Sequence, residues 1–355
     1  MKALTFSEVL IKPKYSEIDS RGKDVYIGSD FGPFKLDLPV FSANMKSITE
    51  HKMAVEMNSN GGMGVLHRFC SIEEAVKEFE RTINEIRRLK IQDKMADLSD
   101  EELIKINGYS CAVSIGVQED DKIRFKTLYD AGARIFVIDI AHGHCKKMKD
   151  QITWIKQNFE DAYIIAGNVA TPEGARDLAE WGAMVVKIGI GPGSACMTRR
   201  NTGVGVPALY AAETVWDEVR YMNPRPKIIL DGGIKYSGDV SKALRYADAV
   251  MLGSYISGTT ETPGQVFKDE NDKHYKVYMG SASGESKVAN GQSGDYIEGV
   301  ALKVPFRGHV RYILKELKQC VQSAFAYTNS RTIEEFHNNC EFIEIGAGGK
   351  EESKI

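Results

Sequence analysis

The chain has 355 residues, of which 43% are hydrophobic and 27% charged, and its formal net charge of −3 gives no basic field that would hold a nucleic acid or an anionic membrane. No apolar run approaches the roughly 20 residues that span a bilayer, and residues 1–6 lack the apolar core of a signal peptide. The six cysteines show no C-x-x-C spacing, which is typical of reduced thiols, so we expect a cytoplasmic protein without disulfides. Because the charge does not favour a nucleic acid or a membrane, we expect the ligand to be a small molecule.

Short apolar runs rich in β-branched residues alternate with helical patterns, which predicts a parallel sheet with helical crossovers. There are eight such runs, at 38–45, 63–69, 111–116, 135–140, 163–169, 184–190, 227–233 and 248–254. Eight units with polar side chains near most strand ends favour an α/β fold of the (β/α)8 barrel type, formed as a single domain by residues 1–355. A doubly wound open sheet is the alternative.

Two of the intervening helices have clear boundaries. Ser71 and Glu74 form a capping-box pattern ahead of apolar residues at helical spacing, which predicts a helix start after the second run. After the fifth run, Thr171 and Pro172 open a second helix, and Gly182 closes it.

Two segments depart from the plain repeat. Residues 91–110 form a polar insertion with a helix signal of its own at 99–102. Residues 256–310 form a long excursion after the eighth run, rich in Gly, Ser, Asn and Gln, which predicts a mobile flap over the barrel mouth, the alternative being a surface loop. Residues 310–328 are expected to form a helix, and residues 342–355 a flexible tail.

The most informative segment is 189–198, a glycine-rich loop that follows the sixth run and presents Cys196 near its end. Glycines let backbone N–H groups approach an anion or let carbonyls converge on a cation, and a cysteine is a strong nucleophile once ionised. The alternative for this loop alone is an ordinary strand-to-helix turn with a buried cysteine.

Taken together, the motifs of this chain resemble the IMP dehydrogenase and GMP reductase family over nearly the whole length. The matching segments are 4–6, 42–45, 66–69, 139–144, 166–171, 189–198, 202–207, 231–234, 251–254 and 304–308. The resemblance implies a (β/α)8 barrel, usually a homotetramer. It also implies that Cys196 attacks C2 of a purine nucleotide to form a covalent thioimidate, while hydride moves between C2 and a nicotinamide cofactor.

The resemblance also assigns binding roles. Asp231 resembles the carboxylate that accepts hydrogen bonds from the substrate ribose, and Asp139 the one beside the nicotinamide ribose. The other substrate-binding candidates are Ser194, Gly232, Gly233, Gly253, Ser254, Tyr278, Gly280 and Ser281, and the other cofactor-binding candidates are Ala141, His142 and Asn168. The carbonyls of Gly191, Gly193 and Cys196 resemble a monovalent-cation site, which implies K⁺.

His142, His144 and Cys145 also allow a different hypothesis, a metal site, because H-x-H at a barrel strand end is a metal-binding pattern elsewhere. We expect no such site, since only one of the other predicted runs, 63–69, has a histidine near its end.

The direction of the reaction depends on the flap. Dehydrogenases of the family activate water with a flap Arg-Tyr pair, whereas this chain has Asp295 before Tyr296. Reductases use a Thr-Glu pair to protonate the departing amine. Thr198 matches the threonine, and Glu285 lies one residue beyond the expected position, which Gly284 occupies.

The family's dehydrogenases usually carry two regulatory nucleotide-binding (CBS) modules between the second and third strands, and only the short segment 91–110 occupies that place. The resemblance therefore favours a GMP reductase that uses NADPH to convert GMP into IMP and ammonia. The alternatives are an IMP dehydrogenase that uses NAD, since 231–239, 258–264 and 298–308 resemble its bacterial members, and a non-catalytic purine nucleotide sensor.

Overall fold

Eight parallel strands form a closed barrel in the computed structural model, which describes residues 2–94, 99, 106, 108–280 and 299–352. The barrel strands are β4 (Val40–Ser42), β5 (Met63–Leu66), β6 (Ala112–Ile115), β7 (Ile135–Asp139), β8 (Tyr163–Val169), β9 (Val185–Ile188), β10 (Lys227–Asp231) and β11 (Ala249–Leu252). They pair in chain order, and β11 closes the ring against β4. All eight predicted runs are barrel strands, so the predicted fold is confirmed.

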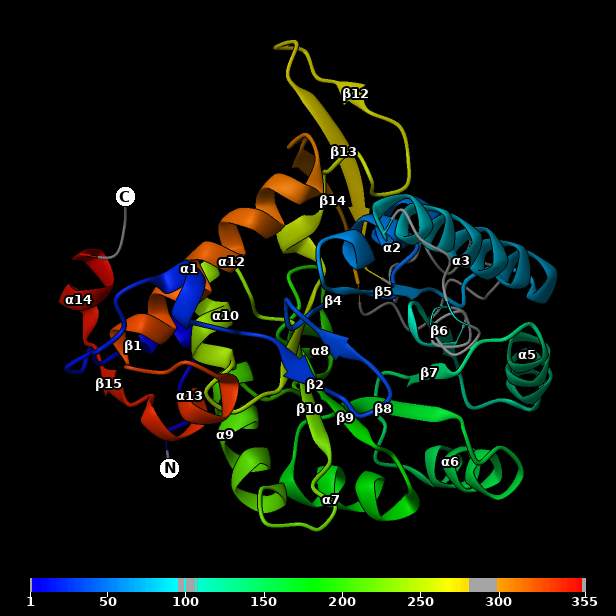
Figure 1. Ribbon diagram of the computed structural model, residues 1–355, viewed down its shortest axis with the longest axis horizontal. Helices are drawn as coiled ribbons and strands as arrows, with labels where there is room; N and C mark the ends of the chain where they lie inside the picture. Colours follow the sequence, from blue (N-terminus) through cyan, green and yellow to red (C-terminus); the bar gives the residue numbers. More distant parts are fainter. Residues whose placement is uncertain (1, 95–98, 100–105, 107, 281–298, 353–355) are drawn as a thin grey trace.

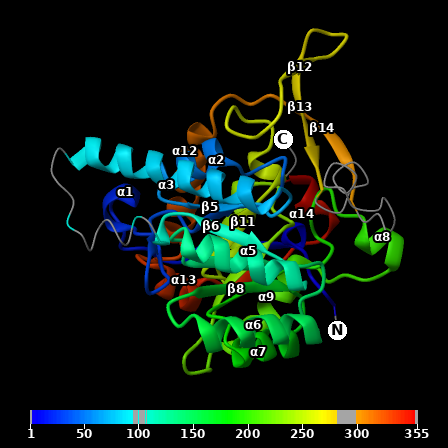
Figure 2. The same cartoon turned by 90° about the vertical axis from the view of Figure 1, so that its right-hand side faces the viewer.

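Helices follow the strands and surround the barrel, as Figures 1 and 2 show. They are α2 (His51–Ser59), α3 (Ile72–Lys94), α5 (Glu119–Asp130), α6 (Lys146–Asn158), α7 (Pro172–Trp181), α8 (Thr198–Thr202), α9 (Ala208–Val219), α10 (Ser237–Ala243) and α12 (Val310–Tyr327). No helix among the described residues has the length and apolar character to cross a membrane.

The helix starts follow the predicted caps. Ser71 N donates to Glu74 Oε2 at 2.9 Å and Glu74 N donates to Ser71 Oγ at 3.1 Å, which is the reciprocal capping box ahead of α3. Thr171 Oγ1 accepts from Gly174 N at 3.2 Å and caps α7, and Gly182 ends that helix with φ of 118°. The helix signal at 99–102 lies almost entirely outside the described residues.

A three-stranded antiparallel sheet projects from the barrel within the excursion after β11 (Figures 1 and 2). It consists of β12 (Phe267–Lys268), β13 (His274–Met279) and β14 (Ala301–Pro305), with Tyr278 opposite Leu302. Residues 281–298, the central part of the expected flap, lie outside the described residues.

The terminal segments pack together rather than trailing away. β1 (Val9–Ile11) pairs antiparallel with β15 (Phe342–Glu344), and the helices α13 (Ile333–Asn339) and α14 (Ala347–Glu352) flank β15. The expected flexible tail from residue 342 is therefore corrected for 342–352, because β1 offers a strand edge and Phe342 packs on Tyr246 with ring centroids 5.9 Å apart. The remaining short elements are η1 (Phe6–Glu8), α1 (Arg21–Asp24), β2 (Ser29–Asp30), β3 (Lys35–Leu36) and η2 (Ser254–Ile256).

Candidate active site

A cavity of about 450 Å³ lies at the carboxyl ends of the barrel strands, which is where barrel enzymes place their chemistry. Most of the predicted site residues line it: Asp139, Ala141, Asn168, Gly191, Gly193, Ser194, Cys196, Thr198, Asp231, Gly232, Gly233, Gly253, Ser254, Tyr278 and Gly280. His142 is exposed and lies outside this lining. Ser281 and Glu285 lie outside the described residues, so their predicted roles stay predictions.

The cysteine of the glycine loop contacts a hydroxyl. Cys196 Sγ donates to Thr198 Oγ1 at 3.2 Å, and Cys196 N donates to Gly193 O at 3.0 Å. The loop approaches its neighbours so closely that a Cβ at Gly189, where φ is 143°, would stand 2.0 Å from the Asp231 carbonyl oxygen. Glycine is therefore required at the base of the loop that presents the thiol.

Both ends of segment 281–298 are held beside this loop. Gly280 N donates to Val300 O at 3.1 Å, and Val300 N donates to Ala195 O at 3.1 Å. Gly299 forms a bridge with Cys196. Gly280 and Gly299 therefore both lie next to the loop that presents the thiol.

Hydroxyls and glycines converge on the other side of the cavity. The Oγ atoms of Ser194, after β9, and Ser254, after β11, lie 2.9 Å apart. Gly232 and Gly233 form the turn after β10 with φ of 89° and 82°, a conformation that favours glycine. Hydroxyls and backbone N–H groups from three neighbouring loops are the kind of donors that hold a phosphate.

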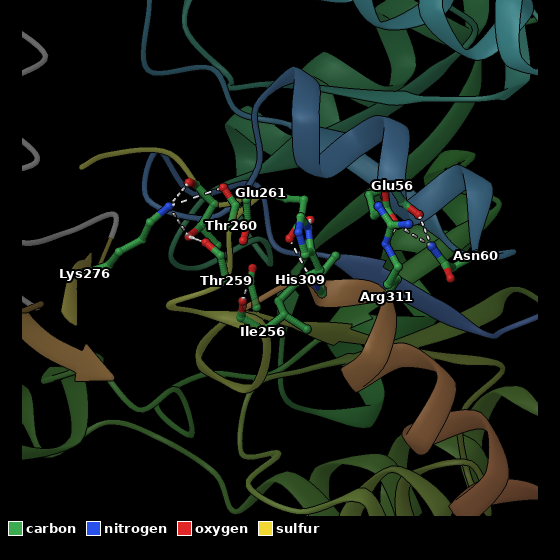
Figure 3. A network of polar contacts seen from close by, with 11 residues as sticks. Glu56, Asn60, Ile256, Thr259, Thr260, Glu261, Lys276, His309 and Arg311 are labelled. Atoms are coloured by element: carbon green, nitrogen blue, oxygen red, sulfur yellow. Dashed lines mark hydrogen bonds and ion pairs between the residues drawn. The ribbon is translucent and has the colours of Figure 1, made fainter. Parts of the chain in front are cut away.

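A buried lysine two residues before Tyr278 joins β13 to the loop that follows η2 (Figure 3). Lys276 Nζ donates to Thr262 O at 2.6 Å, and its burial lowers the pKa of this ammonium group. In the same loop Glu261 accepts from His309 Nδ1 at 2.8 Å and from the backbone N–H of Val310, at the start of α12. These contacts fix the base of the projecting sheet over the cavity. Burial and the nearby charge of Asp231 raise the pKa of Tyr278.

A buried ammonium group joins the two predicted ribose-binding carboxylates, and the sequence interpretation missed it. Lys187 Nζ lies 2.8 Å from Asp139 Oδ1 and 2.8 Å from Asp231 Oδ2, and it also donates to Asn168 Oδ1. Its side chain is 1% exposed, against 21% and 23% for the two carboxylates. The only signal in the sequence was a lysine inside the otherwise apolar run 184–190.

The charges in this cluster stabilise one another. Burial alone would raise the pKa of Asp139, but the Lys187 ammonium, together with Arg68 and Asn44, holds that pKa below its usual range. Burial would lower the pKa of Lys187, but the two carboxylates raise it above its ordinary value. Asp139 and Lys187 are therefore both charged at neutral pH.

The amide of Asn168 is engaged inside the protein. Its Nδ2 donates to Gly189 O at 2.7 Å and to Asp231 Oδ2 at 2.9 Å, while its Oδ1 accepts from Lys187. Asn168 thus orients the loop and the carboxylate, in addition to lining the cavity.

One of the histidines after β7 pairs with an acidic residue on a neighbouring helix. His144 Nε2 lies 2.9 Å from Asp177 Oδ2 on α7. Across the described parts of the chain no three His, Cys, Asp or Glu side chains form a group that could hold a metal ion.

A second, larger cavity of about 1080 Å³ adjoins the first and shares Arg68 and Phe69 with it. Charged side chains of both signs line it, among them Lys46, Arg124 and Glu50. The smaller cavity includes Asp231 at the carboxyl end of β10, and the larger cavity includes Gln118 in the loop after β6.

Three comparisons with known proteins agree with this geometry. The family model described as IMP dehydrogenase / GMP reductase domain matches residues 3–355. An inosine-5'-monophosphate dehydrogenase from Nitrosopumilus maritimus is 31% identical over 469 aligned residues, covering 99% of this chain and 98% of the relative. A GMP reductase from Lactobacillus delbrueckii subsp. bulgaricus is 34% identical over 338 residues, covering 94% of this chain and 92% of the relative.

Among solved structures, a variant GMP reductase from Trypanosoma brucei in complex with guanosine 5'-monophosphate has a TM-score of 0.88 to this chain at 26% sequence identity. The match covers 100% of this chain and 98% of that one. The alignment with the dehydrogenase spans 469 positions, which is more than the 355 residues of this chain. Part of that relative therefore has no counterpart in this chain.

Proposed function

The chain belongs to the IMP dehydrogenase / GMP reductase family, and from this premise we propose that it is a GMP reductase. The reaction combines GMP, NADPH and two protons to give IMP, NADP⁺ and ammonium. The observation that carries the choice of direction is in the flap sequence, where Asp295 stands in place of the arginine that would activate water with Tyr296. A reductase needs no activated water.

The thiol of Cys196 begins the proposed reaction. Its sulfur adds to the electron-poor C2 of the purine, and the thiol proton passes to the Thr198 hydroxyl, which lies 3.2 Å away. The 2-amino group then leaves as ammonia, with its proton supplied through Thr198 and Glu285. After C2 has accepted hydride, the C2–S bond breaks and releases IMP with the free thiolate.

Support for Glu285 in this role comes from the ends of its segment. Gly280 and Gly299 both lie beside the Cys196 loop, as described above.

The cavity residues fit a purine nucleotide and a nicotinamide cofactor. Ser194, Ser254 and the turn at Gly232 offer donors to a 5′-phosphate, and Asp231 offers acceptor oxygens to a ribose diol. When bound, NADPH supplies the hydride. Asp139 and Ala141 line the cavity where its nicotinamide half would bind, and the adjoining cavity offers room for the rest of the dinucleotide.

The proposal includes K⁺ at the carbonyls of Gly191, Gly193 and Cys196. Gly193 O already accepts from Cys196 N within the loop, so a cation would draw on its second lone pair. Such an ion would stiffen the loop that presents the thiol and take no part in bond making. A homotetramer in the cytoplasm stays a prediction.

Paired assays test the proposed function. The protein is incubated with GMP and NADPH, and separately with IMP and NAD, while the absorbance of reduced nicotinamide is followed. We expect decay in the first mixture, with ammonia and IMP formed in equal amounts. Growth of absorbance in the second mixture alone would identify a dehydrogenase, and silence in both would point to a sensor.

The dehydrogenase remains a second candidate because of one observation, the 31% identity to an IMP dehydrogenase over 99% of this chain. Both candidates require the covalent intermediate. Mass spectrometry of the protein trapped during turnover should find a purine adduct on the peptide that contains Cys196, whichever direction the assays support.

A further inference from the structure

Four consecutive barrel strands each contribute one member of a single charged cluster beneath the cavity. Asp139 ends β7, Asn168 lies in β8, Lys187 lies in β9 and Asp231 ends β10. The ammonium group donates to all three of the others, which uses its three protons. A side chain that reaches three neighbouring strands lies inside the barrel.

The carboxylates differ from the ammonium group in their access to the cavity. Lys187 is 1% exposed, whereas more than a fifth of each carboxylate side chain is exposed. For each carboxylate, the structure assigns one oxygen to the ammonium group, Oδ1 of Asp139 and Oδ2 of Asp231. The rest of each carboxylate's acceptor capacity remains for ligands, apart from a side-chain hydrogen bond between Asn44 and Asp139.

We propose that Lys187 is a positioning residue that acts as one shared counter-ion for both nucleotide sites, keeping Asp139 and Asp231 ionised together so that each accepts ligand hydroxyls. This inference rests on the proposed function, which gives Asp231 the ribose of the purine nucleotide and Asp139 the ribose of the nicotinamide cofactor. Its consequence is that both binding sites work unchanged across neutral pH.

Removing the ammonium group makes the two sites depend on pH. The oxygens that contact Lys187 are no further apart than twice 2.8 Å, and two partly buried carboxylates at that separation repel each other when both are ionised. Without the cation, this repulsion favours the uptake of one proton by the pair and raises the pH at which that proton binds. A protonated carboxyl group has lost acceptor capacity, so it binds a ribose diol less well.

The other titratable groups that line the cavity among the described residues are Arg68, Cys196 and Tyr278. Arg68 lies near Asp139 and lowers the pKa of that carboxyl group, and the raised pKa of Tyr278 keeps the tyrosine neutral. Every protein in the experiment carries Cys196→Ala, so the thiol cannot contribute to any pH dependence. The same substitution prevents turnover during the binding measurement.

The experiment measures the dissociation constants of GMP and of NADP⁺ by calorimetry at pH 6, 7 and 8. The proteins carry Lys187→Met, Lys187→Gln or Lys187→Arg in the Cys196→Ala background, and each constant is divided by that of the parent at the same pH. This ratio cancels the titration of the nucleotides' own phosphates. The Gln variant provides the neutral substitution if the Met variant does not fold.

With a neutral residue at position 187, we expect the ratio to rise about tenfold or more between pH 8 and pH 6 for both ligands, because each pH unit below the pKa of a required carboxylate costs up to a factor of ten. Lys187→Arg keeps the charge and should give a ratio that is constant with pH. Lys227→Met, which removes a lysine at the opposite end of the barrel, is the matched control and should also leave the ratio constant.

A flat ratio in the neutral variants, or a pH-dependent ratio for one ligand only, would overturn the shared role of Lys187. Failure of the proposed function looks different, since the parent protein itself would then bind neither GMP nor NADP⁺.

Discussion

The two ends of the barrel both hold a buried charge cluster, but the balance of charges is opposite. At the mouth one ammonium group, that of Lys187, contacts two carboxylates at 2.8 Å. At the base one carboxylate, that of Asp248, contacts the Arg225 guanidinium at 2.7 and 2.9 Å and the Lys227 ammonium at 3.0 Å. Asp248 also accepts from the backbone N–H of Ile228 at 2.8 Å.

The difference shows how the same interaction serves binding or stability. Asp248 is 1% exposed, and protein donors occupy both of its oxygens, so it has no acceptor capacity left for a ligand. At the mouth, two carboxylates contact one ammonium group and reach the cavity, so they retain that capacity. Substitutions at the mouth should therefore change binding and turnover, and substitutions at the base should change stability.

The largest effect is expected at the mouth, for Cys196→Ala. Without the sulfur the covalent step is lost, and kcat should fall at least about 1000-fold, while the free energy of unfolding and the affinity for GMP stay near the wild-type values. Steady-state rates, urea unfolding and calorimetry measure the three quantities. Cys145→Ala is the control, because Cys145 is also half-buried after a barrel strand but does not line the cavity. Substantial turnover by Cys196→Ala would contradict the covalent mechanism.

At the base, Asp248→Asn should show the reverse pattern. The substitution leaves two cations without their carboxylate, and breaking a buried ion pair in this way costs about 3 kcal/mol of unfolding free energy. The KM for GMP and kcat of the folded protein should stay within about twofold of the wild type. Urea unfolding and steady-state kinetics on the same preparation separate the two effects. A large change in KM with unchanged stability would contradict the prediction that residues at the base affect stability and not binding.

The base cluster should also give acid sensitivity with a defined direction. Its cations overcome the effect of burial and lower the pKa of Asp248 from 3.8 to about 2. Because this pKa is depressed in the folded state, the contribution is complete above the unfolded value of 3.8 and is lost as the pH falls toward 2. The stability gap between wild type and Asp248→Asn should shrink by about 1 kcal/mol between pH 7 and pH 3.

Urea unfolding at pH 7, 5, 4 and 3 measures this gap. Asp150→Asn is the control, since Asp150 forms an exposed pair with Lys146 on the surface of α6, where an ion pair contributes little. A gap that stays constant down to pH 3, or that widens, would be inconsistent with a depressed pKa at the base.

The fold was predictable from the sequence because strands buried on both faces appear as continuous apolar runs. The helix caps at Ser71 and Thr171 were predictable for a similar reason, since a cap is a contact between residues three positions apart. The terminal strand β15 was not, because its partner β1 lies more than 300 residues away. Composition alone does not reveal a strand that is ordered by so distant an edge.

The site was predictable only in part. The family resemblance placed the Cys196 loop and both carboxylates, and these residues line one cavity. The lysine that joins the carboxylates was missed, because a single charge in the run 184–190 does not say which side of the strand faces the barrel interior. His142 was expected at the cofactor site, yet the cavity is lined by its neighbour Ala141.

The smallest effect tests whether contact with the cavity, rather than nearness to the mouth, decides what a residue does. Thr171 follows β8 at the mouth side of the barrel, but it caps α7 and does not line the cavity. Thr171→Ala removes the acceptor for Gly174 N and should cost about 1 kcal/mol of unfolding free energy, with kcat and KM unchanged. Thr171→Ser keeps the hydroxyl and should restore most of the stability. If Thr171→Ala lowered kcat severalfold while Thr171→Ser did not, the cap would influence the cavity residues Asn168 and Lys187. Residues that do not line the cavity would then also affect turnover.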